Sequence, residues 1–326
     1  MEYPMPKVSV IIPVYNVEEY IEKCVRSLFS QTLDAVEYIF VNDCTPDKSI
    51  DKVLEILEEY PIRKKSVKFV NHEINKGLPA ARSTGIKYAT GDYVIHSDSD
   101  DWMESTLLEK MYNSVISNNA DCVYCDFNFV KPSGVERYFA PKAKENKIDT
   151  INNWVNTKWT VIWNILAKRS IYVDNDIKFP IGIKYCEDFY VGIQLLCYST
   201  KIVHIAEALH NYNMLNQSSI LHTESLNLMN RDSARVYNEI LDIFNKNNLF
   251  ELYGKSVSWR FLDGMQHCVL DKIYFEKFKT LHPETHKYII SCPYLNKKIK
   301  VLMWCLDKNL DLVVSSFIRI RQFLKR

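Results

Sequence analysis

Short apolar segments alternate with helical patterns over the first hundred residues, and this alternation restricts the fold more than any other feature of the chain. The apolar segments are residues 8–13, 37–41, 67–70 and 93–97. Between them, apolar residues recur at helical spacing in residues 17–30, 49–60 and 78–89. Strands separated by helices in this way predict an α/β fold with a mainly parallel, twisted sheet flanked by helices.

Unusual polar residues follow the predicted strands. Asn16 comes after the first strand, Asp43 after the second, residues 75–77 (NKG) after the third and residues 98–101 (DSDD) after the fourth. The carboxyl ends of parallel strands meet at one edge of a sheet, and ligands of such sheets bind beyond that edge. The sequence therefore predicts a ligand site where these polar residues gather.

The aspartate cluster has two interpretations, a solvated turn or the protein part of a metal site. Asp98 and Asp100 are expected to face the same side of an extended strand end, because they are two residues apart. Asp101 is expected to face the other way and to cap a helix that begins near Met103. A calcium loop is excluded, because Trp102 and Met103 stand where a ligand and a glycine are needed.

Glycine-rich nucleotide loops are missing from the sequence. The eight glycines form neither GxGxxG nor GxxxxGK[ST], which excludes a Rossmann dinucleotide loop and a P-loop. A bound diphosphate would need its counter-charge from another source, such as a metal ion on the aspartates. The net charge of +1 gives no indication of a nucleic-acid partner.

The cysteine pattern and the hydropathy favour a reduced, cytoplasmic setting. Nine cysteines form no paired framework, the first apolar run is too short for a signal peptide, and no segment is long enough to span a bilayer. Cys122 and Cys125 have the spacing of a metal knuckle, but they stand in a predicted strand, where residues three apart point to opposite faces. We interpret both as buried structural side chains.

An ordered series of motifs resembles glycosyltransferase family 2, whose members are inverting sugar transferases of the GT-A fold. The motifs are PVYN at 13–16, VNDCTPD at 41–47, NKGLPAARSTG at 75–85, GDYVIHSDSDD at 91–101 and ED at 187–188. The resemblance implies a GT-A catalytic domain over residues 1–224. Residues 1–101 would be its nucleotide-binding half and 102–224 its acceptor-side half, followed by a helical region at 225–326.

The resemblance also implies how a UDP-sugar donor would be bound. Pro13 and Tyr15 would wall the nucleotide, and Asp43 would hydrogen-bond its pyrimidine base. Asn42 and Cys44 depart from the aspartate and glycine that the family usually carries at these positions, which puts the shape of this loop in question.

The diphosphate and the metal are expected at the next two motifs. By resemblance, Arg82 would contact the diphosphate or position the aspartates, and a purely structural ion pair is the alternative. Asp98 would contact the ribose or a metal-bound water, while Asp100 would bind Mn²⁺ or Mg²⁺. Ser83 replaces the asparagine usual in the family.

Inverting transfer needs a base that removes the proton of the acceptor hydroxyl. The family places this base at the second residue of the ED pair, which is Asp188 here, with Glu187 in a supporting role. The alternative is that both carboxylates only stabilise the start of the helix that follows. Trp163 and Asn164 resemble a family segment that lies beside the acceptor, although packing and loop hydrogen bonds would explain them equally well.

The final segment carries apolar residues at helical spacing from Ile299 to Leu324, with eight basic and two acidic residues between 296 and 326. It is predicted to form a basic amphipathic final helix. This helix either packs on the rest of the chain or makes a peripheral contact with an anionic membrane through residues 297–326, at the inner face of the cell membrane.

The function implied by the resemblance is metal-dependent, inverting transfer of one sugar from a UDP-sugar to a hydroxyl of a glycan or lipid-linked oligosaccharide, in surface polysaccharide biosynthesis. The main alternative is a non-catalytic module that binds a nucleotide or a glycan at a degenerate transferase site. A sugar-phosphate nucleotidyltransferase is a further alternative, but it would carry a glycine-rich segment after the first strand.

Overall fold

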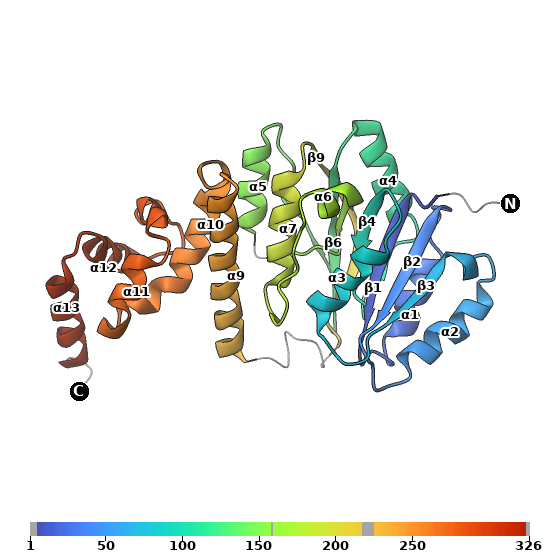
Figure 1. The fold of residues 1–326 in the computed structure, drawn as a ribbon, viewed down its shortest axis with the longest axis horizontal. Coiled ribbons are helices and arrows are strands. Elements are labelled where there is room, and N and C mark those ends of the chain that lie inside the picture. Colours follow the sequence, from blue (N-terminus) through green and yellow to red (C-terminus); the bar gives the residue numbers. More distant parts are fainter. Residues whose placement is uncertain (1–4, 158, 217–224, 324–326) are drawn as a thin grey trace. The chain divides into compact units, whose positions relative to one another are not determined.

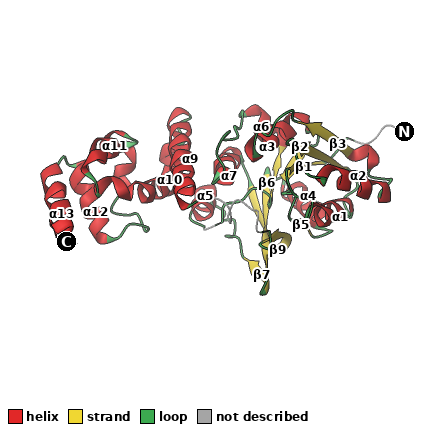
Figure 2. Cartoon of the chain, turned by 90° about the horizontal axis from the view of Figure 1, so that it is seen from below, coloured by secondary structure: helices red, strands yellow, loops and turns green. Residues whose placement is uncertain are grey.

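The computed structural model of the chain describes residues 5–157, 159–216 and 225–323 (Figure 1). The chain divides into two compact units, Met1–Glu224 and Ser225–Arg326. The first unit is built on one large sheet with helices on both faces (Figure 2), and the second is helical. Among the described residues, no helix combines the length and the apolar character needed to cross a membrane.

One mixed sheet organises the first unit. Its strands are β1 (Val8–Val14), β2 (Val36–Asn42), β3 (Val67–Asn71), β4 (Tyr93–His96), β5 (Trp102–Met103), β6 (Cys122–Lys131), β7 (Gly134–Tyr138), β8 (Ile165–Lys168) and β9 (Ile202–Asn213). They are ordered β3-β2-β1-β4-β8-β6-β9-β5, with β7 paired to β6. The first four are parallel, while β8 runs antiparallel to both β4 and β6. The predicted strands are confirmed to within one residue at each end.

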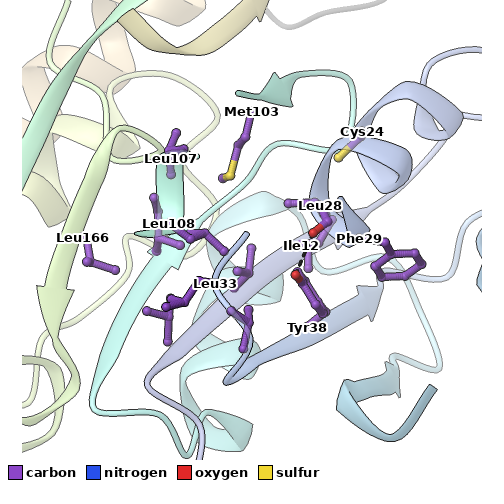
Figure 3. Close-up of a cluster of buried hydrophobic side chains, with 14 of the residues drawn as sticks. Ile12, Cys24, Leu28, Phe29, Leu33, Tyr38, Met103, Leu107, Leu108 and Leu166 are labelled. Carbon is purple, nitrogen blue, oxygen red and sulfur yellow. Dashed lines mark hydrogen bonds between the residues drawn. The ribbon is translucent and has the colours of Figure 1, made fainter. Parts of the chain in front are cut away.

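The main core lies between the sheet and three helices, α1 (Ile21–Phe29), α2 (Ser49–Glu59) and α4 (Leu107–Asn118). Side chains of alternate β1 residues, among them Ile12, pack against Leu28 of α1 and Leu108 of α4 in this cluster (Figure 3). Tyr38 of β2 is buried with them and donates a hydrogen bond from its hydroxyl to the Leu28 carbonyl (2.6 Å). Cys122 and Cys125 are both fully buried on β6, as predicted.

Further helices cover the remainder of the first unit. They are α3 (Leu78–Tyr88), α5 (Lys147–Val155), α6 (Arg169–Asp174) and α7 (Glu187–Tyr198). α3 packs on β1 and β2, and α7 packs on both α5 and α6. α3 and α7 matter most for function, because they carry Arg82 and the Glu187-Asp188 pair.

Gly85 allows α3 to approach the sheet closely. A Cβ atom at this position would come within 2.3 Å of the Cγ2 atom of Ile11, which is fully buried on β1. We expect Gly85→Ala to lower the free energy of unfolding by about 1–3 kcal/mol, because the buried Ile11 side chain cannot move aside without losing its packing contacts. Urea unfolding checks this result. The control is Gly264→Ala, where the added Cβ meets no atom within 4 Å; equal losses in the two variants would contradict the close approach at Gly85.

The described part of the second unit is helical. Its α-helices are α9 (Leu226–Lys246), α10 (Phe250–Gly264), α11 (Phe275–Thr280), α12 (Lys297–Asp307) and α13 (Asp311–Phe323). The prediction of one final amphipathic helix is wrong, because α12 ends at Asp307 and a separate helix, α13, begins at Asp311. Between them, Asn309 adopts a left-handed conformation with a φ of 57°. Apolar spacing continues across the break, and asparagine adopts this left-handed conformation at little cost. Leu324 lies outside the described residues.

The apolar side of α12 packs within the second unit, where Leu302, Met303 and Leu306 are buried. The two acidic residues of this segment are paired: Asp307 with His286 and Asp311 with Lys279. Packing therefore accounts for the apolar periodicity of α12. The membrane contact of residues 297–326 stays a prediction.

Candidate active site

Arg82 connects three carboxylates that the sequence places far apart. Its guanidinium is 1% exposed and donates to Asp98 Oδ1 at 2.7 Å and to Asp188 Oδ1 at 2.5 Å, with Glu187 Oε1 at 3.5 Å. Asp98 follows β4, while Asp188 lies in the first turn of α7, so these contacts join the carboxyl edge of the sheet to the start of that helix. Four predicted site residues thus form one cluster.

The charges of this cluster are strongly coupled. Burial opposes the charged form of Arg82, but Asp188, Asp98 and Glu187 outweigh it and raise the pKa of the guanidinium. Burial also raises the pKa of Asp188, while Arg82 and the backbone amide of Ile162 oppose that shift. The pKa of Glu187 is raised by burial and by the neighbouring Asp188. The arginine therefore favours the ionised form of Asp188 against the effect of burial.

The end of β9 holds the other two aspartates in place. The amide of Asn213 donates to Asp101 Oδ1 at 2.7 Å, and His210 Nε2 lies 3.1 Å from Asp101 Oδ2. The side chain of Asn216 donates to Asp100 Oδ2 at 2.7 Å. No motif marks these three residues in the sequence, and only the pairing of β9 with β5 beside the cluster brings them there.

Asp101 does not cap a helix, so that prediction is wrong. The short strand β5 follows it directly, and α4 begins only at Leu107. Asp101 is fully buried and bonds to β9 instead. Because β9 arrives from more than a hundred residues downstream, local sequence could not indicate this partner.

Trp163 and Asn164 lie beneath the surface beside this cluster. Trp163 is 1% exposed and stacks on the ring of His210, with centroids 4.2 Å apart. Asn164 is 4% exposed and donates to the Cys125 carbonyl at 2.6 Å. Burial lowers the pKa of His210 to about 3, which keeps the ring neutral. Both predicted acceptor-side residues are therefore buried and contact other protein groups in this structure. Contact of either residue with an acceptor stays a prediction.

The predicted base-recognition loop is held by Asp43. This buried carboxylate accepts hydrogen bonds from the amides of Lys76 and Gly77, both at 2.8 Å, and lies 2.6 Å from His72 Nδ1. Asp43 thus ties the loop after β2 to the turn before α3. Contact between Asp43 and a nucleotide base stays a prediction.

The two residues that depart from the family motif, Asn42 and Cys44, are compatible with an ordered conformation of the loop after β2. Cys44 has a φ of 57°, the left-handed conformation that glycine adopts most easily. The side chain of Asn42 accepts a hydrogen bond from the amide of Thr45 at 2.9 Å. Beside this loop, Tyr15 is 46% exposed and Pro13 is buried, so of the two predicted wall residues only the tyrosine presents a ring to solvent.

The aspartates provide oxygen ligands of the kind that Mg²⁺ and Mn²⁺ prefer. Burial and repulsion by Asp101 and Asp98 raise the pKa of Asp100 to about 7, and a cation would relieve this repulsion. Within the described ranges no group of three or more His, Cys, Asp and Glu side chains is arranged to hold a metal. Asp98 and Asp100 fit the usual Mg²⁺ pattern, in which phosphate oxygens and water complete the shell.

The fold and the clustered carboxylates at its carboxyl edge define the first unit as a domain of the GT-A type. *S. aureus* TarS residues 1–349, solved in complex with UDP-GlcNAc, superpose with a TM-score of 0.65 over 96% of this chain and 92% of that one, at 20% identity. The chain belongs to glycosyltransferase family 2, because the model described as "Glycosyl transferase family 2" matches residues 9–175.

Curated relatives give the same family. The uncharacterized glycosyltransferase EpsJ of *Bacillus subtilis* (strain 168) is 32% identical over 216 residues, covering 64% of this chain and 61% of EpsJ. The poly(ribitol-phosphate) beta-glucosyltransferase of *Bacillus spizizenii* is 34% identical over 185 residues, which are 56% of this chain and 28% of that protein. The chain therefore spans less than two thirds of these two relatives.

Proposed function

We propose that the chain transfers one sugar, with inversion, from a UDP-sugar to a hydroxyl of a glycan or lipid-linked oligosaccharide, in surface polysaccharide biosynthesis. The observation that carries the proposal is Arg82, which holds Asp98 of the donor side and Asp188 of the acceptor side in one buried cluster. UDP-GlcNAc in TarS supports the donor class, and the poly(ribitol-phosphate) beta-glucosyltransferase among the relatives supports transfer of a sugar to a polymer.

Asp188 has the environment of a general base. Its side chain is 15% exposed, so an acceptor hydroxyl can reach it, and Arg82 favours the ionised form that accepts a proton. As the hydroxyl oxygen bonds to the anomeric carbon, its proton passes to Asp188, and the bond to the diphosphate breaks to release UDP. Glu187 lies farther from Arg82 and is assigned a supporting role.

The diphosphate side depends on Asp98 and Asp100. Mn²⁺ or Mg²⁺ bound there would neutralise the charge that develops on the leaving diphosphate. The side chain of Asn216 donates a hydrogen bond to one oxygen of Asp100, and Arg82 donates one to an oxygen of Asp98. Both carboxylates are thereby oriented before any ligand arrives, which reduces the cost of organising the site.

Calorimetric titration of UDP tests the donor site. We expect binding with Mn²⁺ that chelator removes and that Asp100→Asn weakens by about a hundredfold or more, since several kcal/mol of charge neutralisation are lost. Asp92→Asn is the matched control, because Asp92 is exposed at the opposite end of β4. Metal-independent binding, or equal binding by both variants, would contradict the assignment of Asp100.

The same titration separates the proposal from the glycan-binding form of its main alternative, whereas a module that binds a nucleotide without catalysis is distinguished by turnover assays with UDP-sugars. A degenerate module that binds only a glycan would bind no UDP under any condition while remaining folded. The departures at Asn42 and Cys44 do not favour that alternative, because Cys44 keeps the left-handed backbone and Asn42 bonds within the loop.

A further inference from the structure

Two aromatic rings form a half-buried surface next to the candidate base. Trp159 and Tyr212, called here the aromatic platform, have ring centroids 5.7 Å apart. Phe129 supports Trp159 at 4.9 Å, and Trp163 lies parallel to Tyr212 with centroids 5.8 Å apart. Neither platform residue belongs to a motif in the sequence.

Each residue of the aromatic platform is close in sequence to a residue whose backbone amide binds a carboxylate of the site. Trp159 lies three residues before Ile162, whose backbone amide hydrogen-bonds to Asp188. Tyr212 directly precedes Asn213, whose amide donates to Asp101. Burial raises the pKa of the Tyr212 hydroxyl, and the nearby Asp101 and Asp100 raise it further. The two rings therefore stand on segments whose backbone contacts Asp188 and the aspartate cluster.

Both rings pack against a buried cluster but keep part of their surface exposed. The buried cluster beneath them is formed by Phe127, Phe129, Val161 and Trp163, and Trp159 and Tyr212 are only partly buried around it. A partly exposed pair of rings offers an apolar face, while the tyrosine retains a polar group. Binding sites for small ligands combine these two features.

The surrounding charge restricts which ligand fits. The largest electrostatic influences on Tyr212 come from four carboxylates, Asp101, Asp100, Asp98 and Asp188. Where no metal ion compensates these carboxylates, they repel a phosphate-bearing part of an acceptor, which is thereby disfavoured at the rings. A neutral pyranose ring has the matching chemistry, with C–H groups for the aromatic faces and hydroxyls that can approach Asp188.

We propose that Trp159 and Tyr212 form the acceptor subsite, on which a neutral pyranose ring of the acceptor glycan stacks with one hydroxyl toward Asp188. This inference rests on the proposed role of Asp188 as the base. It selects a sugar, rather than a polyol phosphate or a lipid diphosphate, as the part of the acceptor that contacts the protein beside the reacting hydroxyl.

Ligand-observed NMR titration tests the subsite, with and without UDP and Mn²⁺. The probes are the methyl α- and β-pyranosides of glucose, galactose, N-acetylglucosamine and N-acetylgalactosamine, together with glycerol 3-phosphate. At least one pyranoside is expected to bind the unaltered chain. Trp159→Ala and Tyr212→Ala are expected to weaken that binding by about tenfold or more, and Trp159→Phe by about threefold or less, since a ring is retained.

Two controls separate a binding role from a structural one. UDP affinity is expected to stay unchanged in all three variants. Tyr60→Ala removes another half-buried ring, which is tilted against Phe29 with centroids 5.5 Å apart, and is expected to leave pyranoside binding unchanged. A general loss of packing would lower UDP binding as well.

The outcomes distinguish the subsite from the donor site. Binding of UDP but of no pyranoside, pyranoside binding that survives Trp159→Ala, or preferential binding of glycerol 3-phosphate would each overturn the aromatic platform as a pyranose site. Pyranoside binding that both alanine variants remove, in a chain that binds no UDP, would support the subsite and reject the proposed donor.

Discussion

Asp188→Asn is expected to lower turnover by a factor of about 10²–10⁴ while leaving UDP binding unchanged. The amide keeps the shape of the side chain but cannot take up the proton of the acceptor hydroxyl. Asp188 lies on the far side of Arg82 from Asp98, so donor affinity is expected to survive the change. Turnover assays with UDP-sugars, paired with UDP titrations of the same preparations, measure both effects.

Glu187→Gln is the matched control for this prediction, because it changes the adjacent carboxylate. It is expected to have the smaller effect on turnover. If Glu187→Gln abolished turnover and Asp188→Asn did not, the two roles would have to be exchanged. If neither variant lost activity, the base would lie elsewhere.

The pH profile gives an independent check on the same residue. Burial raises the folded-state pKa of Asp188 above the ordinary value of 3.8, and the base acts only when ionised. kcat/KM is therefore expected to rise with pH along an acid limb whose midpoint lies above that value. Because Arg82 lowers the pKa of Asp188, removing the charge of Arg82 is expected to raise that pKa and to move the acid limb of the profile to still higher pH.

Arg82→Ala is expected to lower the free energy of unfolding by about 3–5 kcal/mol, the cost typical of removing one partner from a buried ion pair. It would leave Asp98, Glu187 and Asp188 without their common cation. Chemical unfolding at neutral pH measures the loss. Lowering the pH should reduce it, since protonated carboxyl groups no longer need the guanidinium.

Arg26→Ala is the matched control for this second prediction. Arg26 also bridges two carboxylates, Glu22 and Glu59, but all three side chains are well exposed. Solvent screens such pairs, so only a small fraction of the Arg82 effect is expected. Equal losses at the two positions would mean that burial of the Arg82 cluster contributes nothing. Arg82→Lys keeps a charge but cannot bridge two carboxylates in the same way. Its loss of unfolding free energy is therefore expected to lie between those of Arg82→Ala and Arg26→Ala.

The structure also corrects how the aspartate motif is held. The premise that Asp98 and Asp100 lie on an extended strand end is wrong, because β4 ends at His96 and residues 98–101 form a turn in which the Asp101 amide donates to the Asp98 carbonyl (3.2 Å). Alternation along a strand therefore could not show what lies opposite Asp101. The partner of Asp101 is the end of β9, through Asn213 and His210. Asn216, which holds Asp100, carries no signal in the sequence because a single asparagine in a loop is common.

The sequence by itself determined the first half of the sheet and the chemistry at its carboxyl edge. Apolar runs and helical spacing define strands and helices locally, and the parallel order then brings Asp43, Arg82 and Asp98 to one edge. Only the tertiary structure decided what depends on contacts between distant segments. These are the joining of Asp98 to Asp188 through Arg82, the anchoring of Asp101 by β9, the aromatic platform of Trp159 and Tyr212, and the break at Asn309. Periodicity describes a residue relative to its own element, whereas these features depend on which elements pack together.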